Sequence, residues 1–202
     1  MSEFFNLFSE NLIQTTWIEV VAVVFGLLSV WYARKENILV FPTGIISVLI
    51  YVYICFFAGL YADMGINGFY FVMSVYGWYK WTHRDSAQQT IVISFNTLKQ
   101  HLISIAGTIV FFVILYYLLS NYTDSTVPAW DSATTAIFIV GMWLMALKKV
   151  ENWIYWIIGD FVSIPLYFYK GLALTSFQFT VFLILAVWGY IEWRNKVKEQ
   201  QQ

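Results

Sequence analysis

Seven long apolar runs dominate this sequence and restrict what it can fold into. They lie near residues 17–33, 38–57, 62–81, 101–120, 132–147, 152–169 and 172–193. As helices, runs of this length cross the roughly 30 Å hydrocarbon core of a bilayer. Only 11% of the residues are charged, whereas 60% are hydrophobic, so the chain cannot cover a water-exposed surface with charge. The sequence therefore predicts an all-α membrane protein with seven transmembrane helices.

The basic residues alternate from one connection to the next. One set of connections, together with the C-terminal tail, holds ten of the 11 lysines and arginines, and the other set holds only Lys170. The ten are Arg34, Lys35, Lys80, Arg84, Lys99, Lys148, Lys149, Arg194, Lys196 and Lys198. Because cytoplasmic connections carry an excess of basic residues, we expect the C-terminus in the cytoplasm and the N-terminus outside. Glu36 and Glu151 follow basic residues on that side, where we expect local ion pairs.

The chain also resembles itself. Residues 26–37 (GLLSVWYARKEN) align with 141–152 (GMWLMALKKVEN) at a shift of 115, and residues 59–81 align with 171–193 at a shift of 112. We interpret this as a 3+1+3 parallel repeat, in which two three-helix triplets share one orientation and the substrate lies between them. The expected organisation is an N-terminal interfacial segment at 1–16, triplets at 17–81 and 132–193, a loop and linker helix at 82–131, and a cytoplasmic tail at 194–202.

One acidic residue lies in the middle of an apolar run. Asp160 shares a helical face with Trp153, Trp156, Ser163 and Tyr167. A carboxylate at bilayer depth costs about 2.5–3.5 kcal/mol on insertion scales and is by default a functional group. The neighbouring indoles favour a flat, cationic ligand as its partner. The alternative is that Asp160 hydrogen-bonds to another helix and the aromatic rings only pack.

Polar residues on other runs could complete a small-molecule site. Asn67, Tyr70 and Ser74 lie on roughly one face of the third run, and Gln178 lies on the seventh. Hydrogen bonding between helices explains Asn67, Ser74 and Gln178 equally well. The single cysteine and two separated histidines offer no metal site, and no motif or group of residues suggests catalysis. We therefore expect no enzymatic activity, no cofactor, no metal and no nucleic-acid partner.

Two stretches resemble the PnuC family of bacterial vitamin transporters: ENWIYWIIGD with SIPLYFYKGL, and GLYAD with YGWYKW. The resemblance implies facilitated diffusion of an unphosphorylated vitamin across the bacterial inner membrane. It further implies a homotrimer, and a cytoplasmic kinase that traps the vitamin without forming a stable complex. Trp153 and Trp156 match the family's substrate tryptophans.

The same resemblance bears on which vitamin is carried. The nicotinamide riboside branch typically has Asn where this chain has Asp160, Gln where it has Asn67, and Asn where it has Ser74. An acid adds attraction for a fixed cation and for an aminopyrimidine donor, and thiamine has both. We therefore expect thiamine as the substrate, with nicotinamide riboside, also a cation, as the alternative. Riboflavin is neutral and fits an acid worst.

Overall fold

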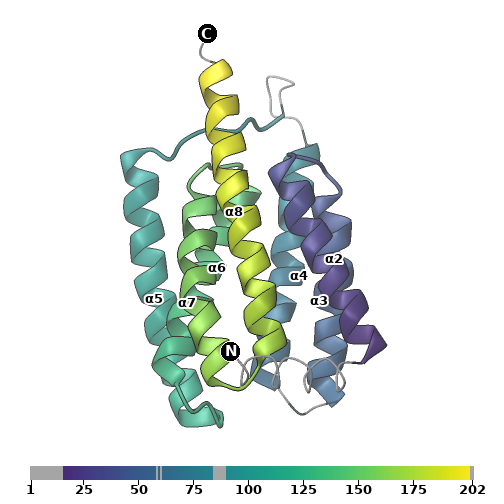
Figure 1. Cartoon of the computed structure of the whole chain (residues 1–202). Helices are drawn as coiled ribbons and strands as arrows, with labels where there is room; N and C mark the ends of the chain where they lie inside the picture. Colours follow the sequence, from purple (N-terminus) through teal and green to yellow (C-terminus); the bar gives the residue numbers. More distant parts are fainter. Residues whose placement is uncertain (1–15, 58, 60, 84–89, 201–202) are drawn as a thin grey trace.

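The computed structural model describes residues 16–57, 59, 61–83 and 90–200, and it shows a bundle of seven helices (Figure 1). They are α2 (Trp17–Arg34), α3 (Val40–Phe57), α4 (Tyr61–Thr82), α5 (Leu98–Tyr122), α6 (Pro128–Ala146), α7 (Asn152–Tyr169) and α8 (Ala173–Glu199). This confirms the predicted all-α fold. Apart from Thr16, the expected interfacial segment 1–16 lies outside the described residues.

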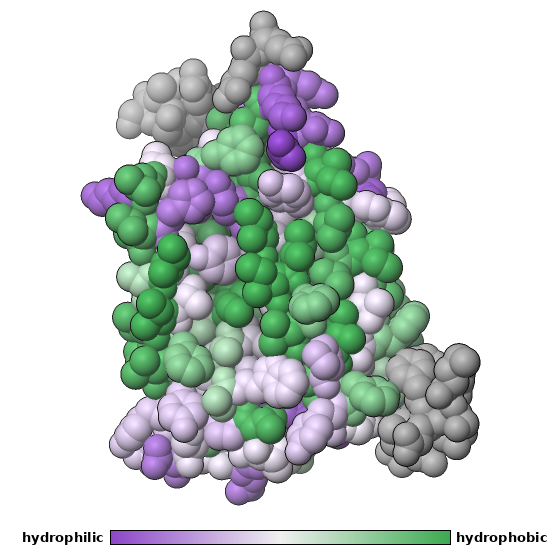
Figure 2. Space-filling view, turned by 60° about the vertical axis from the view of Figure 1, so that its left-hand side comes forward, coloured by the Kyte–Doolittle hydropathy of each residue, from purple (hydrophilic) through white to green (hydrophobic). Residues whose placement is uncertain are grey.

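The helices differ in how apolar they are. Among the described residues, five are long and apolar enough to cross a membrane, namely α2, α3, α5, α6 and α8. The surface shows an apolar band between two more polar ends (Figure 2), as a membrane-embedded bundle requires. The remaining two helices, α4 and α7, are those that carry Asn67, Ser74 and Asp160. The two helices that fall short of this apolar composition are therefore those that carry most of the predicted site residues.

The two triplets are α2–α4 and α6–α8, and α5 links them. Helices α3 and α7 both have 18 residues and begin 112 residues apart, at Val40 and Asn152. Four of the described connection residues have a positive φ, and they form two pairs at the same shift of 112: Glu36 with Lys148, and Gly59 with Gly171. The predicted shift of 115 for residues 26–37 is therefore wrong by three residues. Three residues are nearly one helical turn, so at the wrong shift the aligned segments still placed residues of similar type on the same helical face.

Two tryptophans related by this repeat join the triplets. The indole Nε1 of Trp81 in α4 donates to the Met145 carbonyl, 3.3 Å away, at the end of α6. Reciprocally, the Nε1 of Trp193 in α8 donates to the carbonyls of Ala33 and Arg34, at 3.1 and 3.2 Å, at the end of α2. We call this pair of contacts the tryptophan clasp. Because helix ends leave carbonyl groups unpaired, each indole satisfies such groups in the opposite triplet.

The clasp lies at the end of the bundle where most basic residues gather, which we call the basic end. Glu36 accepts hydrogen bonds from Lys148 at 2.7 Å and from Lys196 at 3.0 Å. The Lys148 ammonium also lies 4.6 Å from the centre of the Trp81 ring. These contacts join the two triplets, so the ion pairs of Glu36 are not local as expected. At the opposite end, Lys170 pairs with Asp131 at 2.6 Å.

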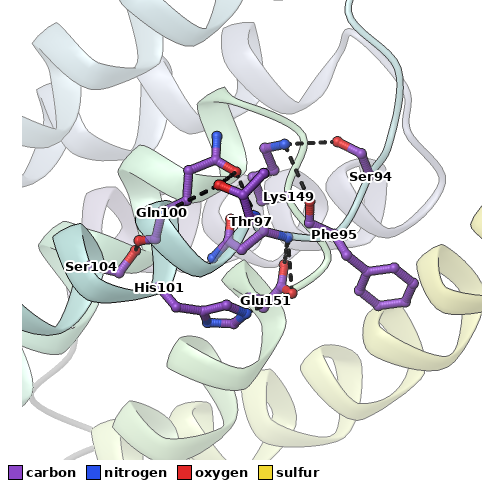
Figure 3. A network of polar contacts seen from close by, with 9 residues as sticks. Ser94, Phe95, Thr97, Gln100, His101, Ser104, Lys149 and Glu151 are labelled. Atoms are coloured by element: carbon purple, nitrogen blue, oxygen red, sulfur yellow. Dashed lines mark hydrogen bonds and ion pairs between the residues drawn. The ribbon is translucent and has the colours of Figure 1, made fainter.

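A stretch before α5 is bound across the turn that leads into α7 (Figure 3). The Ser94 amide donates to the Lys148 carbonyl, and the Val150 amide donates to the Ser94 carbonyl. Both carboxylate oxygens of Glu151 accept from the backbone N–H of Asn96, at 3.0 and 2.9 Å. The partner of Glu151 is thus again distant in sequence, and these bonds fix the start of the helix that carries Asp160.

We predict that Gly189→Ala destabilises the bundle, whereas Gly65→Ala does not. A methyl group at Gly189 would lie 2.6 Å from three ring atoms of Trp153, while one at Gly65 meets no heavy atom of the described residues within 4 Å. Overpacking costs about 1–3 kcal/mol, and removing an exposed helical glycine gains roughly 0.5–1 kcal/mol. Thermal unfolding in detergent should show a lower Tm for Gly189→Ala alone. An unchanged Tm would mean that Trp153 is not rigidly held.

Glu36 should make stability depend on pH. Burial alone would raise the pKa of Glu36, but hydrogen bonds and charge from Lys148 and Lys196 outweigh burial and lower this pKa below its ordinary 4.5. The ionised group therefore stabilises the fold fully above that ordinary value, and this contribution is lost as the pH falls through the lowered one. The free energy of unfolding of the wild type should exceed that of Glu36→Gln at neutral pH, and the two values should converge in acid. A gap that does not narrow would contradict this assignment.

Candidate functional site

A cavity of about 470 Å³ lies between the two triplets, lined by residues of α2, α3, α4, α6, α7 and α8. Seven of the eight residues that the sequence suggested line it: Asn67, Tyr70, Ser74, Trp153, Trp156, Asp160 and Gln178. The structure separates Ser163 from this set, because its side chain is fully buried away from the cavity. The Ser163 hydroxyl has no hydrogen-bond partner among the described residues.

Asp160 lies on the cavity wall and is 2% exposed. Within the described residues, no hydrogen bond or ion pair reaches its carboxylate. An isolated carboxylate in such surroundings is costly, and no described residue of a neighbouring helix supplies a basic partner. The sequence left two interpretations of Asp160 open, and a hydrogen bond to a neighbouring helix does not match this geometry. The arrangement leaves the acid available to a cation inside the cavity.

Aromatic rings form a continuous wall beside Asp160. Trp156 stacks on Phe138 with ring centres 5.3 Å apart, and Phe138 stacks on Phe179 at 5.9 Å. Phe179 in turn stacks on Tyr167 at 5.0 Å, and all four residues line the cavity. A methyl group at Gly159 would overlap the Phe138 ring, so the glycine before Asp160 lets this wall approach the acid. The wall suits a flat or cationic ring.

Trp153 has a different setting from Trp156. It is 1% exposed, and its ring meets Trp193 of the clasp edge to face at 5.5 Å. Phe41 makes the matching contact with Trp81 at 5.0 Å. Both Trp153 and Phe41 line the cavity, so the aromatic layer of the clasp forms its floor at the basic end. The indole Nε1 of Trp153 is buried without a hydrogen-bond partner among the described residues.

The polar groups of the cavity fall into two kinds. Ser29 and Ser47 donate to the carbonyls of Val40 and Ala22, each at 2.8 Å, so these hydroxyls join helices. By contrast, no hydrogen bond of the Ser74 hydroxyl is found within the described part of the chain, although this residue is 2% exposed. The Asn67 amide donates to the Asp63 carbonyl of its own helix at 2.9 Å, which leaves the Asn67 oxygen available.

The two ends of the cavity differ. At the basic end its lining includes Ala33, Val40 and Phe41, which are at most 3% exposed. Towards the opposite end the lining reaches Asp63, which is exposed at the start of α4. Phe138 was not predicted from the sequence, since an apolar residue on an apolar helix gives no signal. In this conformation the cavity is closed at the basic end.

Comparison with known proteins gives a consistent picture. Residues 16–195 match the family described as nicotinamide mononucleotide transporter. The nicotinamide riboside transporter PnuC of Escherichia coli (strain K12) is 26% identical, over 92% of this chain and 88% of that protein. The riboflavin/roseoflavin transporter RibM of Streptomyces davaonensis is 27% identical, over 95% and 90%. A crystal structure of the vitamin B3 transporter PnuC superposes with a TM-score of 0.74 and 26% identity, covering 97% of this chain and 90% of that chain.

The unpaired carboxylate of Asp160 should lower the stability of the protein when no substrate is bound. We predict that Asp160→Val raises the Tm measured in detergent without substrate, by an amount equivalent to roughly 1–3 kcal/mol. Valine is the residue at the repeat-related position, Val48, which also lines the cavity. A lower Tm would mean that the carboxyl group makes a stabilising contact within the bundle.

Proposed function

The chain belongs to the nicotinamide mononucleotide transporter family, and we propose that its cavity carries nicotinamide riboside across the bacterial inner membrane by facilitated diffusion. Membership of this family confirms the prediction of a membrane transporter for a small vitamin, and not an enzyme. The relatives described above are transporters of nicotinamide riboside and of riboflavin; none is described as a thiamine transporter. The proposal therefore reverses the order of substrates suggested by the sequence.

The observation that carries this proposal is the unpaired Asp160 beside an aromatic wall. Nicotinamide riboside has a fixed positive charge on a flat pyridinium ring. Such a ring can stack against Trp156 while its charge faces the carboxylate of Asp160, a pairing that becomes strong once water is excluded. The free oxygen of Asn67 and the hydroxyl of Ser74 are suited to bind the ribose hydroxyls and the carboxamide.

Thiamine remains the second candidate because of the same carboxylate. Its thiazolium ring carries a fixed charge, and its aminopyrimidine offers donors to an acid. Riboflavin lacks a positive charge and would leave Asp160 uncompensated in the occupied cavity. The acid therefore favours the two cations over riboflavin, and the relatives favour nicotinamide riboside between them.

The setting of the transporter is also part of the proposal. We place the basic end in the cytoplasm, with the N-terminus outside, because Arg34, Lys35, Lys148 and Lys149 lie there. The homotrimer and the trapping cytoplasmic kinase stay predictions from the family resemblance. In this orientation the cavity is closed towards the cytoplasm and reaches towards the outer surface at Asp63.

Counterflow in proteoliposomes tests the substrate. Vesicles loaded with unlabelled nicotinamide riboside should accumulate labelled nicotinamide riboside transiently, without an ion gradient or ATP. Unlabelled thiamine inside should support weaker exchange, and riboflavin none. Exchange driven by thiamine but not by nicotinamide riboside would reverse our proposal, and uptake that requires an imposed pH gradient would contradict facilitated diffusion.

Two substitutions on α7 test the role of Asp160 through the affinity of the purified protein for nicotinamide riboside. Asp160→Val removes both the charge and the hydrogen-bonding oxygens, and should weaken binding of nicotinamide riboside by about tenfold or more, since hydrogen bonds to charged groups contribute roughly 1.5–3 kcal/mol. Ser163→Ala, one turn away and outside the cavity, is the control and should bind normally. Equal affinities for all three proteins would remove Asp160 from the site.

A further inference from the structure

The basic end holds a second polar feature, apart from the cavity. Arg34 ends α2, and its guanidinium lies between two indoles, 4.0 Å from the centre of the Trp31 ring and 5.2 Å from that of Trp188 in α8. Arg34 is 6% exposed, whereas Trp31 and Trp188 are 41% and 48% exposed. An almost buried cation is thus flanked by two exposed aromatic rings, where α2 packs against α8.

The hydrogen-bonding capacity of Arg34 is largely unused. Its side chain makes no hydrogen bond to the described residues, and the buried Nε has no partner. Among the residues that the structure describes, its one ionic neighbour is Glu192, whose Oε1 lies 3.5 Å from Nε and is shared with Lys35 at 3.3 Å. A guanidinium has five N–H donors in a fork that matches phosphate, so most of these donors are available to another acceptor.

A hollow beside this group could hold such an acceptor. It measures about 310 Å³ and is lined by Arg34, Trp188, Ile191 and Glu192. The lining holds one cation and one carboxylate, and Lys35, which pairs with the same carboxylate at 3.3 Å, adds a second cation beside the hollow. We propose that it binds the phosphodiester group of an anionic phospholipid, with the guanidinium fork of Arg34 on the phosphate oxygens.

The surroundings favour a lipid over a free anion. Tryptophan side chains accumulate at the headgroup level of membranes, and basic residues between helices at the cytoplasmic side attract anionic headgroups. Ile191 is 49% exposed and, with the two indoles, offers apolar surface to the glycerol and acyl region. Inorganic phosphate would use only Arg34. The assignment to the cytoplasmic leaflet rests on the proposed orientation, but binding itself does not depend on the transported vitamin.

Removing the charge of Glu192 should increase lipid binding, which distinguishes a lipid site from a structural ion pair. The Glu192 carboxylate competes with a phosphate for Arg34 and repels it, so Glu192→Gln should bind anionic lipid more tightly than the wild type does. Arg34→Gln should bind it at least about tenfold more weakly, because a charge-assisted bidentate contact is lost. Arg194→Gln is the matched control: it removes the same charge from an exposed position on α8, two residues from Glu192 and therefore on another face.

Native mass spectrometry of the delipidated, full-length protein can measure this directly. Phosphatidylglycerol, phosphatidylcholine or inorganic phosphate is added, and adducts per protomer are counted together with the oligomeric state. We expect phosphatidylglycerol adducts that increase in Glu192→Gln, decrease in Arg34→Gln and are unchanged in Arg194→Gln, with few phosphatidylcholine or phosphate adducts.

Four results would overturn the proposal. Equal adducts with phosphatidylcholine would show that headgroup charge plays no part, and adducts with phosphate alone would show a simple anion site. Fewer adducts in Glu192→Gln would show that Arg34 and Glu192 form only a structural pair. A change of oligomeric state in Arg34→Gln or Glu192→Gln, with lipid adducts unchanged, would assign this face to contact with another copy of the chain. None of these results bears on vitamin transport, which the counterflow assay tests separately.

Discussion

Two indole N–H groups hold the halves of this bundle together at one end, each donating to backbone carbonyls of the opposite triplet. A buried hydrogen bond contributes only about 0.5–1.5 kcal/mol, but leaving its partners unpaired costs more, so the contact fixes where the triplets meet. Trp153 and Phe41 pack against these same tryptophans. The floor of the cavity is therefore a consequence of the contact that joins the halves.

The repeat supplies a symmetric frame for an asymmetric site. At a shift of 112, Asp160 corresponds to Val48, Trp156 to Gly44, and Phe138 to Gly26, and all six residues line the cavity. The second triplet thus carries the acid and the large rings, while the first has small or apolar residues at the matching positions. These small residues leave room for a ligand, so the cavity depends on both halves although the charge comes from one.

Much of the site could be predicted because lipid restricts which residues are tolerated. Asp160, Asn67 and Ser74 stand out from apolar helices, and all three reach the cavity. Ser163 was placed on the same face by spacing, yet residues three and four apart on a helix point in slightly different directions, and only packing decides which reach a cavity. Phe138 gave no signal, since its role depends on Gly159, 21 residues away, which leaves space for its ring.

By itself the sequence determined the number of helices, the 3+1+3 order and the end at which basic residues gather, because each follows from hydropathy, repetition or composition along the chain. Tertiary structure alone decided the register of the repeat, the distant partners of Glu36 and Glu151, and the unpaired state of Asp160. These depend on which side chains of different helices come within a few ångströms. Such distances follow from helix packing, which periodicity along a single helix does not contain.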